Sequence, residues 1–258
     1  MNEQNFDYLK NQIKYSGFGD SLEASLKEQL QQGSLEFTLK HQAKFGGDRV
    51  DSTLFFQRSN QSDRYFFSRY DSILTKEGQE DPSISQTFYM GKDNHMTLKE
   101  GYNLLDGRAV KKELVNKDQQ KYQAWVQLDF RNTDRLGNFK YQLFHEKYGF
   151  DLQKTLEKYP IKELQVPEDL NRLMDSLKKG NRQSVVFLQE NGEQKRFIEA
   201  IPKFKSIQVY DSNQMKINPS PKVSAKESKA TSQKTEIKAG SEDHSPKKTR
   251  KRKSNGIR

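Results

Sequence analysis

The sequence predicts an α+β fold of about three repeated units, each a short helix plus an antiparallel β-hairpin or small sheet, with a disordered basic C-terminal tail. Three observations predict it. A helix that ends in Leu-x-x-Gly occurs three times, alternating apolar and polar residues follow each occurrence, and the composition changes near residue 214. The three helix ends are at Gly33, Gly107 and Gly180, about 73 residues apart. Chance recurrence of a common helix end is the alternative explanation.

The first predicted unit covers residues 1–87. Leucines at every fourth position predict an amphipathic helix over 22–30, which Gly33 ends. Two strand-like stretches, 52–57 and 64–70, flank a polar loop and predict an antiparallel hairpin. Residues 75–87 are polar and contain Gly and Pro, so they predict a connector.

The second predicted unit covers residues 88–166. Thr97 and Glu100 have the spacing of a capping box at the start of a helix. Strands are expected around 110–115 and 122–130, followed by a connector with helical character. Trp125 falls on the polar face of the second strand, so either another unit covers it or it contacts a partner.

The third predicted unit covers residues 167–213. Pro167 stands where a first helical residue often does, and the apolar residues that follow have helical spacing. Asn191-Gly192 predicts a tight β-hairpin turn, because both residues tolerate positive φ. The tail, 214–258, is rich in Ser, Lys, Thr and Pro; residues 219–258 contain no aromatic residue and hold +8 of the net charge of +10. Such a segment is expected to be disordered.

Several stretches of the chain resemble a known group of proteins. They are residues 101–110 (GYNLLDGRAV), 122–130 (YQAWVQLDF), 147–150 (KYGF), 160–164 (PIKEL), 176–181 (SLKKGN) and 209–211 (VYD). These stretches are similar to segments of uncharacterised Bacteroidota proteins with domains of unknown function, and the resemblance covers residues 88–211. Those proteins are often linked to conjugative or integrative elements, sometimes near topoisomerase genes. The resemblance implies a genomic neighbourhood of DNA transfer, and it implies no catalytic residues.

The residue types argue against an enzyme. The chain has no cysteine, which excludes disulfides, thiolate metal sites and cysteine nucleophiles. Its four histidines lie far apart in the sequence and form no metal-binding pattern, and no phosphate loop or nucleophile elbow is present. We therefore expect no catalytic residue, no metal and no cofactor. The chain also has no apolar stretch long enough to span a membrane and no signal peptide, so a cytoplasmic protein is expected.

The predicted hairpin is the best nucleic-acid candidate in the folded part. Arg58, Arg64 and Arg69 alternate with aromatic residues, and exposed rings beside guanidinium groups are typical of surfaces that bind single strands. The alternative is a hairpin covered on both faces, with buried rings and arginines that reach out to solvent.

The basic tail is the second candidate. Its densest run of positive charge could contact phosphates without sequence preference, or it could only solubilise the chain. The run consists of Lys247, Lys248, Arg250, Lys251, Arg252 and Lys253.

These features together predict a non-enzymatic accessory or interaction protein of a mobile DNA element. Weak, non-specific binding of DNA or RNA through the tail is expected, together with a protein partner from a DNA-transfer system. The alternative is a regulatory module or subunit of a DNA-processing enzyme, such as a relaxase or topoisomerase assembly.

Overall fold

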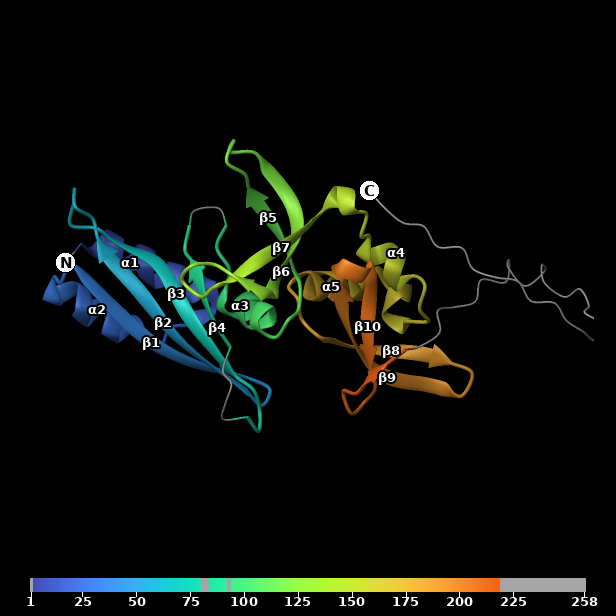
Figure 1. The fold of residues 1–258 in the computed structure, drawn as a ribbon. Helices are drawn as coiled ribbons and strands as arrows, with labels where there is room; N and C mark the ends of the chain where they lie inside the picture. Colours follow the sequence, from blue (N-terminus) through green and yellow to red (C-terminus); the bar gives the residue numbers. More distant parts are fainter. Residues whose placement is uncertain (1, 80–83, 92–93, 219–258) are drawn as a thin grey trace, which may run out of the picture. The chain divides into compact units, whose positions relative to one another are not determined.

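The computed structural model of the chain describes residues 2–79, 84–91 and 94–218. Within this part of the chain, five α-helices and three antiparallel sheets alternate along the sequence (Figure 1). The fold is therefore α+β, as the sequence predicts. None of the helices in the described ranges has both the length and the apolar character that a membrane crossing needs.

The first sheet is a four-stranded meander in the order β1-β2-β3-β4. Two helices, α1 (Glu3–Ile13) and α2 (Glu23–Gln32), bury their apolar residues against one face of it (Figure 1). The four strands are β1 (Glu36–Phe45), β2 (Asp48–Arg58), β3 (Tyr65–Thr75) and β4 (Ile84–Tyr89). The predicted hairpin is confirmed as β2 and β3, which pair antiparallel.

The prediction of a connector over 75–87 is wrong at its C-terminal end, because β4 lies there. The inward positions of β4 include Gln86, so the strand lacks a clean apolar alternation. Gln86 is buried and pairs with the backbone of Phe139: its Nε2 donates to the carbonyl oxygen over 3.2 Å, and its Oε1 accepts from the amide over 2.8 Å. A buried amide with both groups satisfied substitutes for an apolar side chain.

The second sheet has the strand order β5-β6-β7. Its strands are β5 (Val110–Val115), β6 (Lys121–Thr133) and β7 (Phe139–His145). The preceding helix, α3 (Leu98–Leu105), begins with the predicted capping box: the Thr97 amide donates to Glu100 Oε2 over 2.9 Å. α3 also packs against the first sheet, where Tyr70 donates to the carbonyl oxygen of Met96 over 2.9 Å.

The third sheet has the strand order β8-β9-β10-β11. Its strands are β8 (Gln183–Gln189), β9 (Gly192–Ile201), β10 (Ser206–Tyr210) and β11 (Lys216–Ile217). Two helices, α4 (Leu152–Leu156) and α5 (Pro167–Lys178), contribute to its core. Trp125 is buried in this same core, with its ring 5.4 Å from that of Phe150, so the rest of the fold covers it.

The predicted start of the disordered tail, at 214, is too early. β11 lies at 216–217 and pairs with β10, opposite Val209 and Tyr210. This strand is only two residues long, and sequence patterns do not detect strands that short. Residues 219–258, the remainder of the predicted tail, lie outside the described residues.

The three predicted helix stops are glycines with positive φ, at 72° for Gly33, 80° for Gly107 and 79° for Gly180. An antiparallel sheet follows each of them, but the sheets have four, three and four strands. One core combines residues from α1 through β6, and the other combines residues from Ala109 through Val209. The repeat and the boundaries at 87/88 and 166/167 therefore stay predictions.

Candidate functional site

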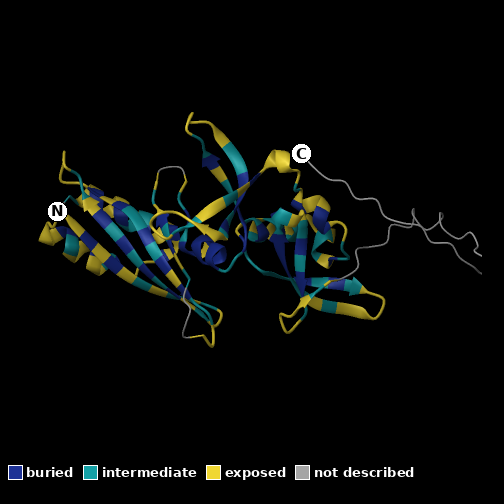
Figure 2. Cartoon of the chain, viewed as in Figure 1, coloured by how far each residue is buried: buried dark blue, intermediate teal, exposed yellow. Residues whose placement is uncertain are grey.

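The first sheet has two different faces. Figure 2 shows buried and accessible residues alternating along its strands. The buried ones share one core with apolar residues of α1, α2 and α3. We call the opposite face, which none of the described helices packs on, the outer face. Two aromatic side chains on it are largely exposed, Phe66 at 54% and Tyr89 at 59%. Exposed apolar side chains that lie close together often mark an interaction site, so this face is a candidate.

A β-bulge decides which residues of β3 reach the outer face. Phe55 pairs with Arg69, whereas the next residue, Phe56, pairs with Phe67, so Ser68 is the extra residue. Strict alternation puts residues three apart on opposite faces. The bulge instead directs Phe67 and Tyr70 inward, where both are buried, and leaves Phe66 and Arg69 on the outer face.

Three neighbouring strands contribute to one row of side chains on the outer face. Phe55 on β2 pairs with Arg69 on β3, which pairs with Tyr89 on β4. The Arg69 guanidinium lies 3.9 Å from the centre of the Phe55 ring, a cation–π contact. Phe66 is on the same face, opposite Gln57. We call Phe55, Phe66, Arg69 and Tyr89 the aromatic platform.

The charges around the platform are mixed. The outer face has four cations and three carboxylates: Lys40, Lys44, Arg49 and Arg69, with Glu36, Asp51 and Asp71. Two of the cations lie near a carboxylate, since Arg49 Nε is 2.9 Å from Asp51 Oδ2 and Arg69 Nε is 3.9 Å from Asp71 Oδ1. The face is therefore only slightly positive, so stacking rather than charge would dominate any contact with nucleic acid.

The structure brings together only part of the predicted set. Arg69 lies in the platform, and Arg64 is exposed just before β3, two residues from Phe66. Arg58 instead lines a small pocket with Asn2, Leu30 and other residues, on the side of the sheet that α1 and α2 cover. The structure thus separates Arg58 from Arg69. The tail residues Lys247, Lys248, Arg250, Lys251, Arg252 and Lys253 lie outside the described residues.

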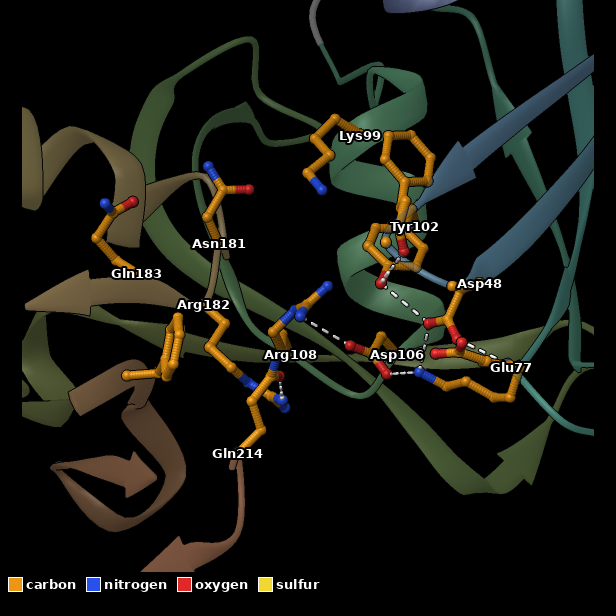
Figure 3. A pocket seen from close by; sticks show the side chains of 15 residues that line it. Asp48, Glu77, Lys99, Tyr102, Asp106, Arg108, Asn181, Arg182, Gln183 and Gln214 are labelled. Atoms are coloured by element: carbon orange, nitrogen blue, oxygen red, sulfur yellow. Dashed lines mark hydrogen bonds and ion pairs between the residues drawn. The ribbon is translucent and has the colours of Figure 1, made fainter. Parts of the chain in front are cut away.

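A second site is a pocket of about 560 Å³ where the first sheet, α3 and the third sheet meet. Figure 3 shows Lys99 and Tyr102 from α3 on one side, Asn181, Arg182 and Gln183 on the other, and Arg108 between them. Asp48, at the start of β2, and Lys76 and Glu77, just after β3, complete the wall. The pocket is also lined by Phe45, Asp106, Phe197 and Gln214. We call this the polar pocket.

A chain of ion pairs forms one wall of the polar pocket. Lys76 Nζ is 2.9 Å from Asp48 Oδ2 and also contacts Asp106, whose other oxygen is 2.8 Å from Arg108 Nη1. Burial alone would raise the pKa of Asp48, but hydrogen bonds from Lys76, from the Glu77 amide and from Tyr102 outweigh it and lower that pKa. Asp48 is therefore charged at neutral pH, and both Asp48 and Asp106 are already engaged by cations.

Within the described residues, no group of three His, Asp or Glu side chains is arranged to hold a metal ion. The sequence matches no family model, no curated protein and no solved structure. The two sites are therefore judged by their geometry.

Sequence reasoning missed Tyr89 and the polar pocket. Tyr89 is missed because no strand is predicted there: most of β4 falls in the predicted connector at 75–87, and Tyr89 lies just beyond it. The pocket combines residues from Phe45 to Gln214, and no spacing in the sequence indicates that they meet. The aromatic-rich hairpin is the one usable signal, and it indicates Arg58, Arg64 and Arg69 with the rings around them, without separating the exposed rings from the buried ones.

Proposed function

We propose that this protein is a non-enzymatic binding protein that holds single-stranded nucleic acid on the outer face of its first sheet, with the basic tail adding contacts to phosphates. One observation carries the proposal: Phe55, Phe66 and Tyr89 lie with Arg69 on an accessible sheet face. Bases stack on such rings whatever their identity, so binding without sequence preference is expected.

The platform is wide enough for more than one base. Adjacent strands are about 4.8 Å apart, so Phe55 and Tyr89, which are two strands apart, are separated by roughly 10 Å at the backbone. An extended single strand can place two of its bases over rings at such a separation. Each stacked base contributes about 1–3 kcal/mol, so two or three rings together supply about 2–9 kcal/mol, which is at most sub-micromolar binding.

Because the charges of the outer face are mixed, we expect most of the salt dependence of the nucleic-acid affinity to come from the tail. Each phosphate neutralised on a single strand adds about 0.7 to the slope of log K against log salt. The six clustered tail cations are therefore expected to contribute a steep slope, and the platform a contribution that depends little on salt. A role as an accessory protein of a mobile DNA element remains part of the proposal.

The test is fluorescence anisotropy with a labelled oligothymidine and the full chain. We expect Phe66→Ala and Tyr89→Ala each to weaken binding roughly 5- to 100-fold. Tyr15→Ala is the matched control, because Tyr15 is an exposed ring that is not on the outer face. It should bind like the wild type.

A second variant separates the tail from the platform. In it, Gln replaces all six clustered tail cations. Its salt slope should fall, while Phe66→Ala made in this background should still weaken binding by the same factor. Unchanged binding by both platform variants would refute the proposed interface and leave the tail as the whole of the interaction.

A further inference from the structure

The polar pocket has a feature that the proposed function does not use: almost all of its spare side-chain hydrogen-bonding groups are donors. Apart from the Glu77 carboxylate, its side-chain acceptors are occupied, since Asp48 and Asp106 accept from cations and Tyr102, while Asn181 Oδ1 accepts from Asn103 over 3.0 Å. The amide oxygens of Gln183 and Gln214 accept from Ser176 and Arg182. A ligand there must therefore be rich in acceptors.

The donors without a partner come from different segments of the chain. Arg108 is buried, at 7% exposure, and its Nε donates to no described group although it lines the pocket. Because this Nε has almost no accessible surface, Arg108 can favour an anionic ligand through its charge but not through a hydrogen bond from Nε. The amide NH₂ groups of Gln183 and Gln214 also donate to no described residue.

Lys99 is the cation in the pocket wall best placed for an anion. Within the described part of the chain no carboxylate lies within ion-pair distance of it, and its ammonium instead lies 4.3 Å from the ring centre of Phe45 and 4.6 Å from that of Tyr102. Desolvation by these surroundings lowers the pKa of Lys99, and the charge of Arg108 lowers it further, against a smaller opposite effect of Asp106. An anion beside Lys99 would offset both effects.

We propose that the polar pocket binds a small phosphate monoester that has a planar ring, of the nucleoside monophosphate class. Lys99 holds the phosphate, because a charged donor of this kind forms the strongest hydrogen bonds to phosphate oxygens, and the charge of Arg108 attracts it further. The ring rests against Phe197, within reach of the Gln183 and Gln214 amides, which donate to ring nitrogens. The volume of about 560 Å³ is within the usual range of small-molecule sites.

Glu77 gives the proposal an internal control. It is exposed on the pocket wall, next to Gly47, and it is the one lining carboxylate for which no ion pair with a described residue is found. Its charge opposes an anionic ligand, so its removal should strengthen binding. Removal of the Lys99 charge should therefore weaken ligand binding, whereas removal of the Glu77 charge should strengthen it.

The experiment is isothermal titration calorimetry of the full chain with AMP at low salt. We expect Lys99→Gln to weaken AMP binding at least about tenfold, as loss of a charge-assisted hydrogen bond does, and Glu77→Gln to tighten it. Lys27→Gln, an exposed lysine on α2, is the control and should bind AMP like the wild type. Inorganic phosphate and adenosine should each bind more weakly than AMP.

Several results would overturn the proposal: no heat with wild-type protein in the millimolar range, equal binding by Lys99→Gln, or adenosine that binds as well as AMP. AMP binding by the polar pocket should not depend on the nucleic-acid interface proposed on the outer face. Phe66→Ala, on the outer face, should bind AMP unchanged, and AMP should not displace a bound oligothymidine. Loss of AMP binding in Phe66→Ala would contradict a separate pocket.

Discussion

Asp106 is the residue whose removal should destabilise the fold most clearly. Its carboxylate contacts Lys76 and Arg108, and the side chains of Asp106 and Arg108 are only 12% and 8% exposed. In Asp106→Ala, Arg108 keeps one hydrogen bond, to Asn103 Oδ1 over 2.7 Å, and becomes a buried charge with no counterion in the described part of the chain. Breaking a buried ion pair in this way costs about 3–5 kcal/mol, so a loss of this size is expected.

The assay is equilibrium urea unfolding of the full chain, followed by far-UV circular dichroism and by the fluorescence of Trp125, the single tryptophan. Two probes with coincident transitions justify a two-state free energy. Asp118→Ala is the control, because Asp118 is exposed in a turn, and it should change stability by less than about 0.5 kcal/mol.

A double variant tests the physical reason for the loss. Asp106→Leu combined with Arg108→Met removes both charges, so it should be more stable than Asp106→Leu alone. If Asp106→Ala cost less than about 1 kcal/mol, or if the double variant lost the sum of the two single losses, the uncompensated charge would not be the cause.

Three further predictions concern stability. Gly180→Ala should lower the stability of the fold more than Gly33→Ala. Both glycines have positive φ, which costs about 1–2 kcal/mol for alanine, but only at Gly180 would the new Cβ lie 2.9 Å from a backbone oxygen, that of Ala109. Equal midpoints of urea unfolding for the two variants would contradict this prediction. Burial lowers the pKa of His41, against a smaller effect of the Phe18 backbone, so the stability of the wild type should decline as the pH falls below about 6.5. The stability of His41→Gln, measured by urea unfolding over that range, should decline less. Parallel curves would show that His41 is not the cause of the decline. The lowered pKa of Asp48 means that its ionised form stabilises the fold above about pH 4, and this contribution is lost in more acidic solution. In a circular dichroism titration with acid, Asp48→Asn should therefore lose structure less steeply than the wild type. Identical titration profiles would contradict this prediction.

Local signals in the sequence predicted local structure well. The capping box at Thr97 and the helix start at Pro167 are present, and the hairpin predicted at Asn191-Gly192 is present with its turn one residue earlier, at Glu190-Asn191. Each depends on residues within a few positions of one another, whose backbone preferences the neighbouring chain alone determines. The helix stop at Gly33 belongs to the same class.

Features that depend on distant contacts were not predictable. The bulge at Ser68 turns Phe66 and Arg69 to the outer face, and only the pairing with β2 reveals it. β4 is a strand although it buries Gln86, because β7 supplies hydrogen-bond partners that lie 53 residues away. The polar pocket is the extreme case, since its walls come from all three sheets or the turns beside them.

Photo-crosslinking tests the nucleic-acid interface most directly. A single-stranded oligonucleotide with 5-bromouracil is irradiated with the full chain, and the cross-linked peptides are identified by mass spectrometry. We expect cross-links at Phe55, Phe66 or Tyr89 that persist when the tail cations Lys247 to Lys253 are replaced by Gln. Cross-links found only in the tail, with none in β2, β3 or β4, would contradict the interface proposed on the outer face.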